Sequence, residues 1–421
     1  MRIIRGTPVS DGSRKIGIAL SGGGSRAMAF HLGCLRTLHR LGILEQARVL
    51  STVSGGSVIG AMYAAHDGTF EDFEEQVRAV LHVGFVRSTL RTAATTWEGP
   101  KALGSSVLLL AAWLWLVPFR LIASAVSRTV TDRRRGEVGV APERWMPRRF
   151  ASRTTILRRA FDTLLFEGKA LGKLRADRPR WVAVAAELRT GSAFYFGRQD
   201  AGSWRYGSID PAQVPIALAV AASAAYPLLL PALDEFFSFQ KRDGSIRMER
   251  VTLTDGGVYD NLGLAPLWPD RDRTVSIGVE DIDTIIACRA GYGLRTGNPC
   301  VFFPSRMVAA FHCTHNRAQN LTMNRLFDLK NAGRLKAFAL PYLDQDDSRL
   351  AYPPPDLVRR AAVIGYRTDF SAMPSEWIEK LSKRGEQLTL AVIREHAPEL
   401  LPPDWDADSG SKRGLRPSPC P

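Results

Sequence analysis

The chain is poor in cysteine and in clustered metal ligands. Its five cysteines are scattered over 421 residues and form no CxxC pair, so we expect neither a disulfide framework nor a zinc site. The stretch His312-Cys313-Thr314-His315 has no second cluster at metal-ligand spacing, and no metal is expected there. The first 15 residues contain no apolar run, so an ordinary secretory signal is missing and a cytoplasmic protein is predicted.

Acidic residues are also in deficit. The 42 Asp and Glu are outnumbered by 56 Lys and Arg, which gives a net charge of +14 and suggests a polyanionic partner, either nucleic acid or an anionic membrane. No basic strand interleaved with aromatics and no zinc module supports nucleic-acid binding, and we predict none. The composition, 45% hydrophobic and 23% charged, excludes a disordered, fibrous or polytopic membrane protein.

Strand-like and helix-like segments alternate in the first part of the chain. Residues 15–21 and 48–53 read as strands, and glycines link each of them to a helix, at 27–41 and up to about residue 66. This alternation predicts an α/β fold with a parallel sheet wrapped by helices. Further strands are expected at 181–185, 193–196, 251–254 and 273–279, and further helices at 69–80, 155–166, 211–226 and 375–396.

A basic, apolar segment interrupts this pattern. Residues 102–119 carry no charge, and as a helix they would span about 27 Å, which is marginal for a bilayer. The surrounding residues 86–160 hold 14 Arg and Lys against four acidic residues. Most of the excess positive charge therefore lies beside the longest uncharged run.

Both early strands end in a glycine turn that opens a helix, a geometry that presents backbone N–H groups to an anion. The first turn, Gly22-Gly23-Gly24-Ser25-Arg26-Ala27, fits the dinucleotide pattern GxGxxA. That pattern also needs a carboxylate near the end of the second strand. The second strand ends Thr52-Val53-Ser54 without one, so a nicotinamide or flavin site is discounted.

The second turn places Ser54 at a strand-to-helix elbow. Such a position suits a nucleophile, although a serine there is also a common helix N-cap. Ser57 is a second candidate but has no glycine two residues after it. No histidine lies in an obvious loop after a strand. Asp255, by contrast, closes a predicted strand and precedes Gly256 and Gly257, where an α/β fold displays catalytic side chains.

Taken together, these motifs resemble the patatin-like phospholipases. The family's GGGxRG turn is similar to Gly22–Ala27, its VSGGS elbow to Val53–Ser57, and its Asp-Gly-Gly motif to Asp255–Gly257. The resemblance covers about residues 15–85 and 156–264. This chain departs from it at Ala27 and at Thr52, each of which replaces a glycine.

The resemblance implies a three-layer α/β/α sandwich with a mainly parallel central sheet, plus the helical insertion. It also implies a lipid acyl-ester hydrolase of phospholipase A or lysophospholipase type, without metal or organic cofactor. Ser54 would be the nucleophile and Asp255 the base of a dyad that needs no histidine. The oxyanion would be held at Gly22, Gly23, Gly24, Ser25 and Arg26, mainly by the Gly23 and Gly24 amides, with Gly55, Gly56, Gly256 and Gly257 as supporting turns. Arg26 would fix the turn or add positive potential, or else form a salt bridge on the first helix.

A Ser54–Asp255 dyad forbids a single membrane span at 102–119, because the two residues would then lie on opposite sides. A re-entrant hairpin near Pro118, a helix in the membrane interface and a helix buried in the protein or in a dimer remain open. We predict peripheral or monotopic association with an anionic membrane. The alternative is a catalytically degenerate membrane-binding protein. The expected divisions are residues 1–85 and 156–345 for the catalytic domain, 86–155 for the insertion, 346–401 for a helical extension and 402–421 for a disordered tail.

Overall fold

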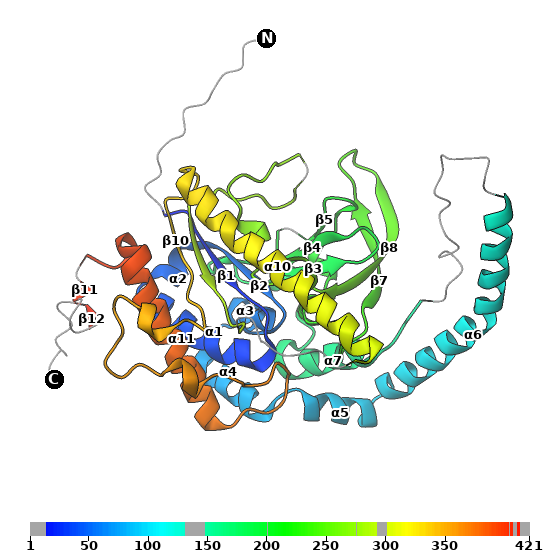
Figure 1. Ribbon diagram of the computed structural model, residues 1–421, viewed down its shortest axis with the longest axis horizontal. Helices are drawn as coiled ribbons and strands as arrows, with labels where there is room; N and C mark the ends of the chain where they lie inside the picture. Colours follow the sequence, from blue (N-terminus) through cyan, green and yellow to red (C-terminus); the bar gives the residue numbers. More distant parts are fainter. Residues whose placement is uncertain are drawn as a thin grey trace, which may run out of the picture.

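A ten-stranded mixed sheet lies at the centre of the computed structural model (Figure 1). The strand order is β10-β9-β1-β2-β3-β4-β5-β6-β7-β8. The structure describes residues 14–130, 148–199, 201–274, 276–292, 301–403, 405–406 and 411–412, with the side chains of helix α6 as far as Trp115.

Five strands of the sheet are parallel: β10 (Ala337–Ala339), β9 (Thr284–Cys288), β1 (Ile16–Leu20), β2 (Ala47–Val53) and β3 (Arg180–Glu187). The others are antiparallel: β4 (Ser192–Gly197), β5 (Gly202–Ser203), β6 (Gly207–Ser208), β7 (Leu233–Gln240) and β8 (Ile246–Asp255). The sheet is therefore mixed, with its parallel half where the sequence predicts it.

Strand β8 returns to β3 and positions the site. Val53, the last residue of β2, pairs with Val184 of β3. Asp255, the last residue of β8, pairs with the next residue of β3, Ala185. The ends of β2 and β8 therefore meet beside one short stretch of β3.

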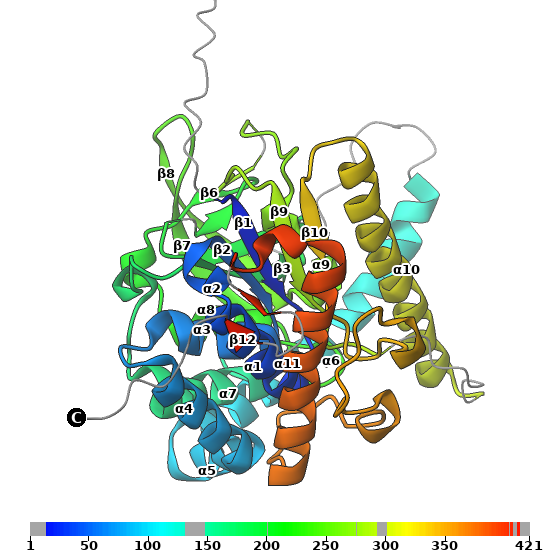
Figure 2. The same cartoon turned by 90° about the vertical axis from the view of Figure 1, so that its left-hand side faces the viewer.

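Helices cover both faces of the sheet, which gives the predicted three layers (Figure 2). One face packs against α1 (Gly24–Arg40), α3 (Gly55–Ala65), α8 (Ile216–Ser223) and α11 (Ser375–His396), with α2 (Ile43–Gln46) and α4 (Phe70–Val83) beside them. The other face packs against α10 (Phe303–Asn331) and the segment around η5 (Ala265–Leu267). Continuous apolar strands such as β1, buried throughout, fit a sheet covered on both sides.

Helices α1 and α11 pack through glycine at two facing points. A β-carbon on Gly33 would lie 1.7 Å from the Ser382 carbonyl oxygen, and one on Gly385 would lie 2.1 Å from that of Phe30. The predicted C-terminal extension thus supplies a helix that packs along α1.

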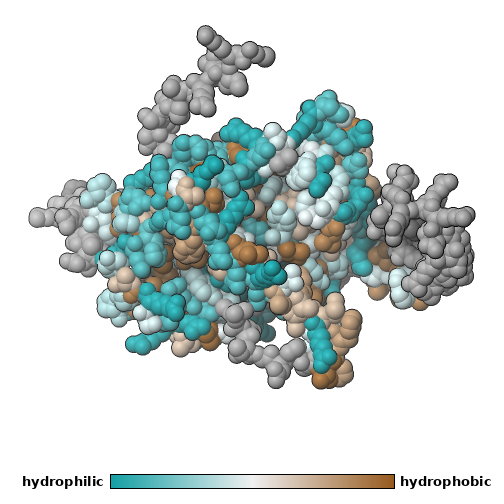
Figure 3. Space-filling view, turned by 45° about the horizontal axis from the view of Figure 1, so that its top comes forward, coloured by the Kyte–Doolittle hydropathy of each residue, from teal (hydrophilic) through white to brown (hydrophobic). Residues whose placement is uncertain are grey.

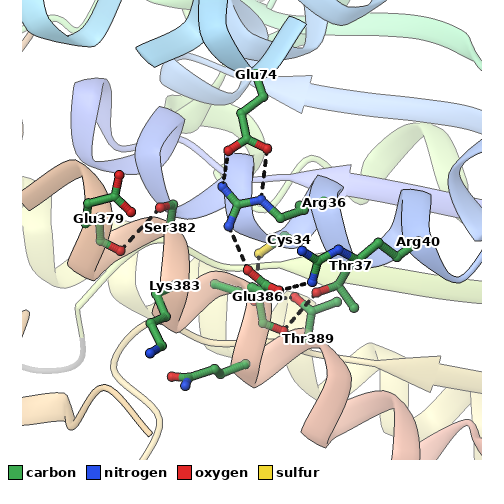
Figure 4. A network of polar contacts seen from close by, with 12 residues as sticks. Cys34, Arg36, Thr37, Arg40, Glu74, Glu379, Ser382, Lys383, Glu386 and Thr389 are labelled. Atoms are coloured by element: carbon green, nitrogen blue, oxygen red, sulfur yellow. Dashed lines mark hydrogen bonds and ion pairs between the residues drawn. The ribbon is translucent and has the colours of Figure 1, made fainter. Parts of the chain in front are cut away.

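An ion-pair network joins the same helices to α4 (Figure 4). Arg36 of α1 donates from Nε to Glu74 of α4 at 2.9 Å and from Nη1 to Glu386 of α11 at 2.6 Å. Arg40 pairs with the other oxygen of Glu386. Because the Arg36 side chain is only 13% exposed, this arginine links three helices from within the layer.

Most predicted elements are present, but the bounds of several differ. The first helix begins three residues early, at Gly24, and Thr69 and Asp72 form the expected capping box of α4. The helix expected at 155–166 is α7 (Arg153–Phe161) followed by a π turn, η2 (Asp162–Phe166). The helix expected at 211–226 is reduced to η4 (Pro211–Gln213) and α8.

The strand predicted at 273–279 is wrong: its described residues form turns and bends. Arg271 explains the difference, because its guanidinium binds the carbonyls of Ile277 and Gly278 that a strand would use in its ladder. The place beside β1 is taken by β9.

The insertion forms two helices that lead away from the sheet, α5 (Val86–Thr95) and α6 (Glu98–Val130) (Figure 1). Because α6 continues through Pro118, the re-entrant hairpin is wrong. A helix buried within this chain is also wrong for the part whose side chains are described, since Leu103, Leu110 and Trp115 are 69%, 58% and 73% exposed. Burial in a dimer stays an alternative. In the described part of the chain, no helix is long and apolar enough to cross a membrane. The interface helix stays a prediction.

The predicted disordered tail contains a short antiparallel pair, β11 (Trp405–Asp406) and β12 (Ser411–Lys412). Residues 404, 407–410 and 413–421 lie outside the described residues.

Candidate active site

Ser54 occupies a sharp turn between β2 and α3. Its φ of 52° and ψ of −120° place a non-glycine residue in a region that costs about 1–3 kcal/mol. The Ser54 N–H donates to Ser223 Oγ at 3.0 Å, and the residue is 8% exposed. The backbone therefore holds this serine in the strained geometry of a nucleophile elbow.

Asp255 lies beside Ser54, close enough for the Ser54 hydroxyl to influence the pKa of its carboxyl. The Gly257 N–H donates to Asp255 Oδ1 at 2.7 Å. Asp255 is 3% exposed, and this burial raises its pKa to about 7, against the lowering effects of the Gly257 amide and the Ser54 hydroxyl. A carboxylate with a pKa near 7 is a stronger base than an ordinary aspartate.

The two glycine turns are packed directly on each other. A β-carbon on Gly55 would lie 2.3 Å from the Gly24 carbonyl oxygen, and one on Gly56 would lie 2.4 Å from that of Leu20. At the third turn, a β-carbon on Gly256 would lie 2.1 Å from the Val184 carbonyl oxygen, and one on Gly257 would lie 2.9 Å from Asp255 Oδ1. The predicted supporting glycines therefore sit where backbone approaches backbone or the Asp255 carboxylate.

The oxyanion candidates differ in what their amides do. The Gly22 N–H donates to the Asn261 carbonyl at 3.1 Å, and the Ser25 N–H donates to the Asp369 carbonyl at 2.8 Å. Neither amide is available to an oxyanion in this structure, which corrects the prediction for these two residues. For the Gly23 and Gly24 amides, at the start of α1, no partner is recorded within the described residues.

Arg26 braces the first turn. Its Nε donates to the Ala290 carbonyl at 3.0 Å and its Nη1 to the Tyr366 carbonyl at 3.2 Å. The guanidinium carbon lies 4.2 Å from the centre of the Tyr292 ring. Of the roles predicted for Arg26, fixing the turn is the one that these contacts describe.

The sequence matches the patatin-like phospholipase family over residues 18–268, more than half of the chain. The chain belongs to the patatin-like phospholipase family. The matched range contains both glycine turns and the Asp255 turn of this family member. No curated protein sequence matches the chain significantly.

Three solved structures similar to the chain are VipD, a human cytosolic phospholipase A2 and the type III effector ExoU. VipD from Legionella pneumophila is 14% identical, with 91% of this chain and 67% of that chain covered and a TM-score of 0.39. Human GIVD cytosolic phospholipase A2 is 12% identical, with 94% of this chain and 63% of that chain covered and a TM-score of 0.48. The type III effector ExoU is 12% identical, with 91% of this chain and 53% of that chain covered and a TM-score of 0.33. This patatin-like chain thus spans about two thirds of these proteins or less.

A network of buried hydroxyl groups stabilises the turn that contains Ser54. Thr52 Oγ1 accepts hydrogen bonds from Trp181 Nε1 at 2.9 Å and from Ser57 at 3.0 Å. Ser57 Oγ lies 2.8 Å from Ser223 Oγ, which donates to the Val184 carbonyl at 2.6 Å. The Thr52 side chain is therefore accommodated rather than crowding the turn, and Ser57 belongs to the support. Sequence reasoning missed Ser223, whose signal in the sequence is its place within residues 156–264, which resemble the family.

Helix α10 lies over the Asp255 turn, outside the family match. Burial, together with His312, lowers the pKa of His315, and the nearby Gly257 backbone opposes this lowering. One turn further along, Gln319 Oε1 accepts from Asn261 Nδ2 at 3.4 Å. The segment His312–His315, where no metal is expected, thus contributes His315 to the surroundings of Asp255, a placement that local spacing did not predict.

Proposed function

We propose that this protein hydrolyses lipid acyl esters through a Ser54–Asp255 dyad. The observation that carries the proposal is the position of Ser54 beside a buried carboxyl whose pKa is raised to about 7. The strained elbow that presents Ser54 (φ 52°) supports the same role. Phospholipids and related lipid esters are the proposed substrates, in keeping with the family.

In the proposed reaction, Ser54 Oγ attacks the acyl carbonyl carbon while its proton passes to Asp255. The Gly23 and Gly24 amides stabilise the oxyanion, and loss of one such donor typically raises a barrier by about 3–4 kcal/mol. Collapse breaks the ester bond, and the departing alcohol takes the proton from Asp255. Water then attacks the acyl-enzyme with Asp255 as the base, which releases the fatty acid and restores Ser54.

We further propose that the protein works at an anionic membrane surface. Exposed apolar side chains follow α6 at Leu103, Val107, Leu110 and Leu114, each more than half exposed. A second group lies at the start of α10, where Val301, Phe302, Phe303 and Met307 are 54–76% exposed, and brown side chains gather at the lower right of Figure 3 where this helix begins. Both groups together are called the apolar surface below.

The charge around the apolar surface supports this location. Arg87, Arg91 and Lys101 are exposed on α5 and at the start of α6, within the segment that carries most of the excess positive charge. Each basic residue near an anionic surface contributes about 1 kcal/mol to binding.

A fluorophosphonate probe tests the chemistry, because it labels only an activated serine. We expect labelling of the wild type and of Ser57→Ala, and no labelling of Ser54→Ala. Fatty-acid release from phospholipid should disappear in Ser54→Ala and fall steeply in Asp255→Asn. Unlabelled but folded wild-type protein would favour the degenerate, non-catalytic alternative.

Flotation with liposomes tests the membrane proposal separately. The double variant Leu110→Ser/Leu114→Ser should float less with vesicles containing phosphatidylserine than the wild type does. The matched control is Ile246→Ser/Met248→Ser, which removes two apolar side chains that are 72% and 64% exposed on β8. Equal flotation of both variants would contradict a role for α6.

A further inference from the structure

Arg289 is a charged residue beside the first glycine turn, and the proposed reaction does not use it. It follows Cys288, the last residue of β9, whose carbonyl accepts from the Ser21 N–H at 3.1 Å. Its other neighbour, Ala290, donates from its N–H to Ser21 Oγ at 2.8 Å. Hydrogen bonds on both sides therefore fix the backbone of Arg289 next to the residue that precedes the turn Gly22–Gly24.

The Arg289 side chain lies on the α10 side of the sheet, as expected from the alternation of side chains along a strand: Cys288 packs in the core under α1, and Ala287 in the core on the opposite face. The guanidinium carbon lies 4.4 Å from the centre of the Tyr342 ring. Nη1 donates to Met323 Sδ of α10 at 3.1 Å, and a thioether is a weak acceptor. An aromatic face and a sulfur atom thus hold this group without neutralising its charge.

The guanidinium has nitrogens without an acceptor. Nε is buried and has no partner, and no acceptor of Nη2 is recorded among the residues that the structure describes. Nη2, unlike Nε, is not fully buried, so it is the nitrogen that a ligand can reach. Burial lowers the pKa of Arg289, and Tyr342 and Asp344 offset this lowering only in part. Because buried charges in proteins are ordinarily paired, this arginine lacks an anion.

The carboxylates around Arg289 do not supply that anion. Asp344 Oδ1 accepts from Arg360 Nε at 2.5 Å, and Asp344 Oδ2 accepts from the Tyr342 hydroxyl at 3.3 Å. The charges of Asp344 and Arg360 cancel each other, which leaves the charge of Arg289. This arginine does not contribute to the shifted pKa of Asp255, so it is not the partner of the candidate base either. No ion pair of Arg289 is recorded within the described part of the chain.

Helix α10, which crosses the sheet in Figure 1, links this guanidinium to the candidate active site. Met323 contacts the guanidinium, and Gln319, about 6 Å earlier along the helix, accepts from Asn261 Nδ2 at 3.4 Å. Asn261 Oδ1 would lie 2.5 Å from a β-carbon on Gly22, and that β-carbon would lie 3.2 Å from Ser54 Cβ. One helical turn therefore separates the contact with the unpaired arginine from the contact with the catalytic turns.

We infer that Arg289 binds the phosphate of a phospholipid substrate and selects phospholipids over neutral acyl esters. In a glycerophospholipid, only a few covalent bonds separate the phosphate from the ester carbonyls, so an anion at Arg289 and an ester at Ser54 can belong to one molecule. Hydrogen bonds from arginine to phosphate are charge-assisted and about twice as strong as neutral ones. A neutral glyceride has no anion to offer this group. The inference rests on the proposed function, because it concerns the substrate of the same site.

Turnover of two short-chain lipids tests the selectivity. Dihexanoyl phosphatidylglycerol and dihexanoylglycerol carry the same acyl chains, and only the first has a phosphate. Both are used as monomers, so that binding to a lipid surface does not enter the rates. In Arg289→Gln, the ratio of kcat/KM for the phospholipid to kcat/KM for the neutral lipid should fall about tenfold or more. Arg289→Lys, which keeps the charge but loses the planar fork, should recover part of the ratio.

Arg317→Gln is the matched control for charge, because it removes one exposed arginine from α10 and should keep the wild-type ratio. An unchanged ratio in Arg289→Gln would overturn the inference, even if both rates fell together, because an equal loss on both lipids would mean that Arg289 only braces the glycine turn.

Binding measured without hydrolysis separates this inference from the proposed function. Calorimetric titration of the Ser54→Ala protein with monomeric dihexanoyl phosphatidylglycerol should show an affinity about tenfold higher than that of Ser54→Ala/Arg289→Gln. Equal affinities, or tighter binding of inorganic phosphate than of the lipid, would overturn the inference. If the wild type hydrolyses neither lipid but the affinities differ, the proposed function fails and the phosphate site stands. Hydrolysis of both lipids with an unchanged ratio would leave the ester chemistry intact and remove the role of Arg289.

Discussion

Gly55, the residue after the candidate nucleophile, packs directly on Gly24 of the first glycine turn. A β-carbon at position 55 would lie 2.3 Å from the Gly24 carbonyl oxygen and 2.7 Å from the Gly24 nitrogen. Backbone atoms cannot move aside as a flexible side chain can. The elbow that presents Ser54 and the turn whose amides would hold the oxyanion are therefore one packed unit, and moving either changes the distance between nucleophile and oxyanion site.

This contact predicts that Gly55→Ala strongly lowers esterase activity. The added methyl must push α1 and α3 apart, and shifts of about 1 Å in an active site can cost a hundredfold in rate. The control is Gly104→Ala, because a β-carbon there meets nothing within 4 Å and alanine favours a helix. Turnover of a short acyl ester measures both variants; equal activity would contradict the packed unit.

The raised pKa of Asp255 predicts the pH dependence of hydrolysis. As a base, Asp255 must be ionised, so kcat/KM should rise with pH and level off above a midpoint at about 7. The measurement is kcat/KM of the wild type from pH 5 to 9 on an uncharged ester. A midpoint near 4, the ordinary aspartate range, would show that the active base is not this buried carboxyl.

The same pKa predicts that Asp255 reduces stability at high pH. Its carboxyl ionises with a pKa of about 3.8 in the unfolded chain but about 7 in the native protein. The contribution of Asp255 to the free energy of unfolding is therefore fully present below pH 4 and is lost as the pH rises to 7. The loss is about 4 kcal/mol at 1.36 kcal/mol per pH unit.

Asp255→Asn should therefore unfold at higher denaturant concentration than the wild type at pH 8, with a difference that shrinks towards pH 4. Denaturant unfolding at both pH values measures it. A constant difference across this range would mean that the effect does not come from ionisation of Asp255.

The arginine network between α1, α4 and α11 predicts a stability difference between two neighbouring arginines. Arg36→Met leaves Glu74 and Glu386 without their shared cation and should cost about 2 kcal/mol. Arg40→Met removes a partner of Glu386 that is 60% exposed and should cost less than about 1 kcal/mol. Denaturant unfolding compares the two; equal losses would contradict the buried linking role of Arg36.

Local sequence patterns predicted the chemistry-bearing turns because those turns depend on residues close together in the chain. A short apolar run such as residues 15–21 is typical of a buried strand, and glycines at positions 22–24 and 55–56 mark places where backbones approach closely. The family resemblance rested on these same short motifs, and the match over residues 18–268 confirms it.

The sequence predictions that were wrong concern residues whose structure depends on contacts with residues far away in the chain. The strand predicted at 273–279 has strand-like composition, but Arg271 binds its carbonyls and β9 takes the place beside β1. The Ser25 amide was predicted to be an oxyanion donor. In the structure it donates instead to the carbonyl of Asp369, more than 340 residues away, at 2.8 Å.

The deficit of cysteine excluded a disulfide framework, and the deficit of acidic residues suggested a polyanionic partner. The alternation of strand-like and helix-like segments and the glycine turns were enough to predict an α/β fold and to select Ser54 and Asp255 as candidates, because these patterns are local properties of the sequence. Only the tertiary structure brought the ends of β2 and β8 to adjacent residues of β3, buried Asp255 and raised its pKa. Burial and long-range pairing depend on which segments meet, and that is decided by packing across the whole sheet rather than by any one stretch of sequence.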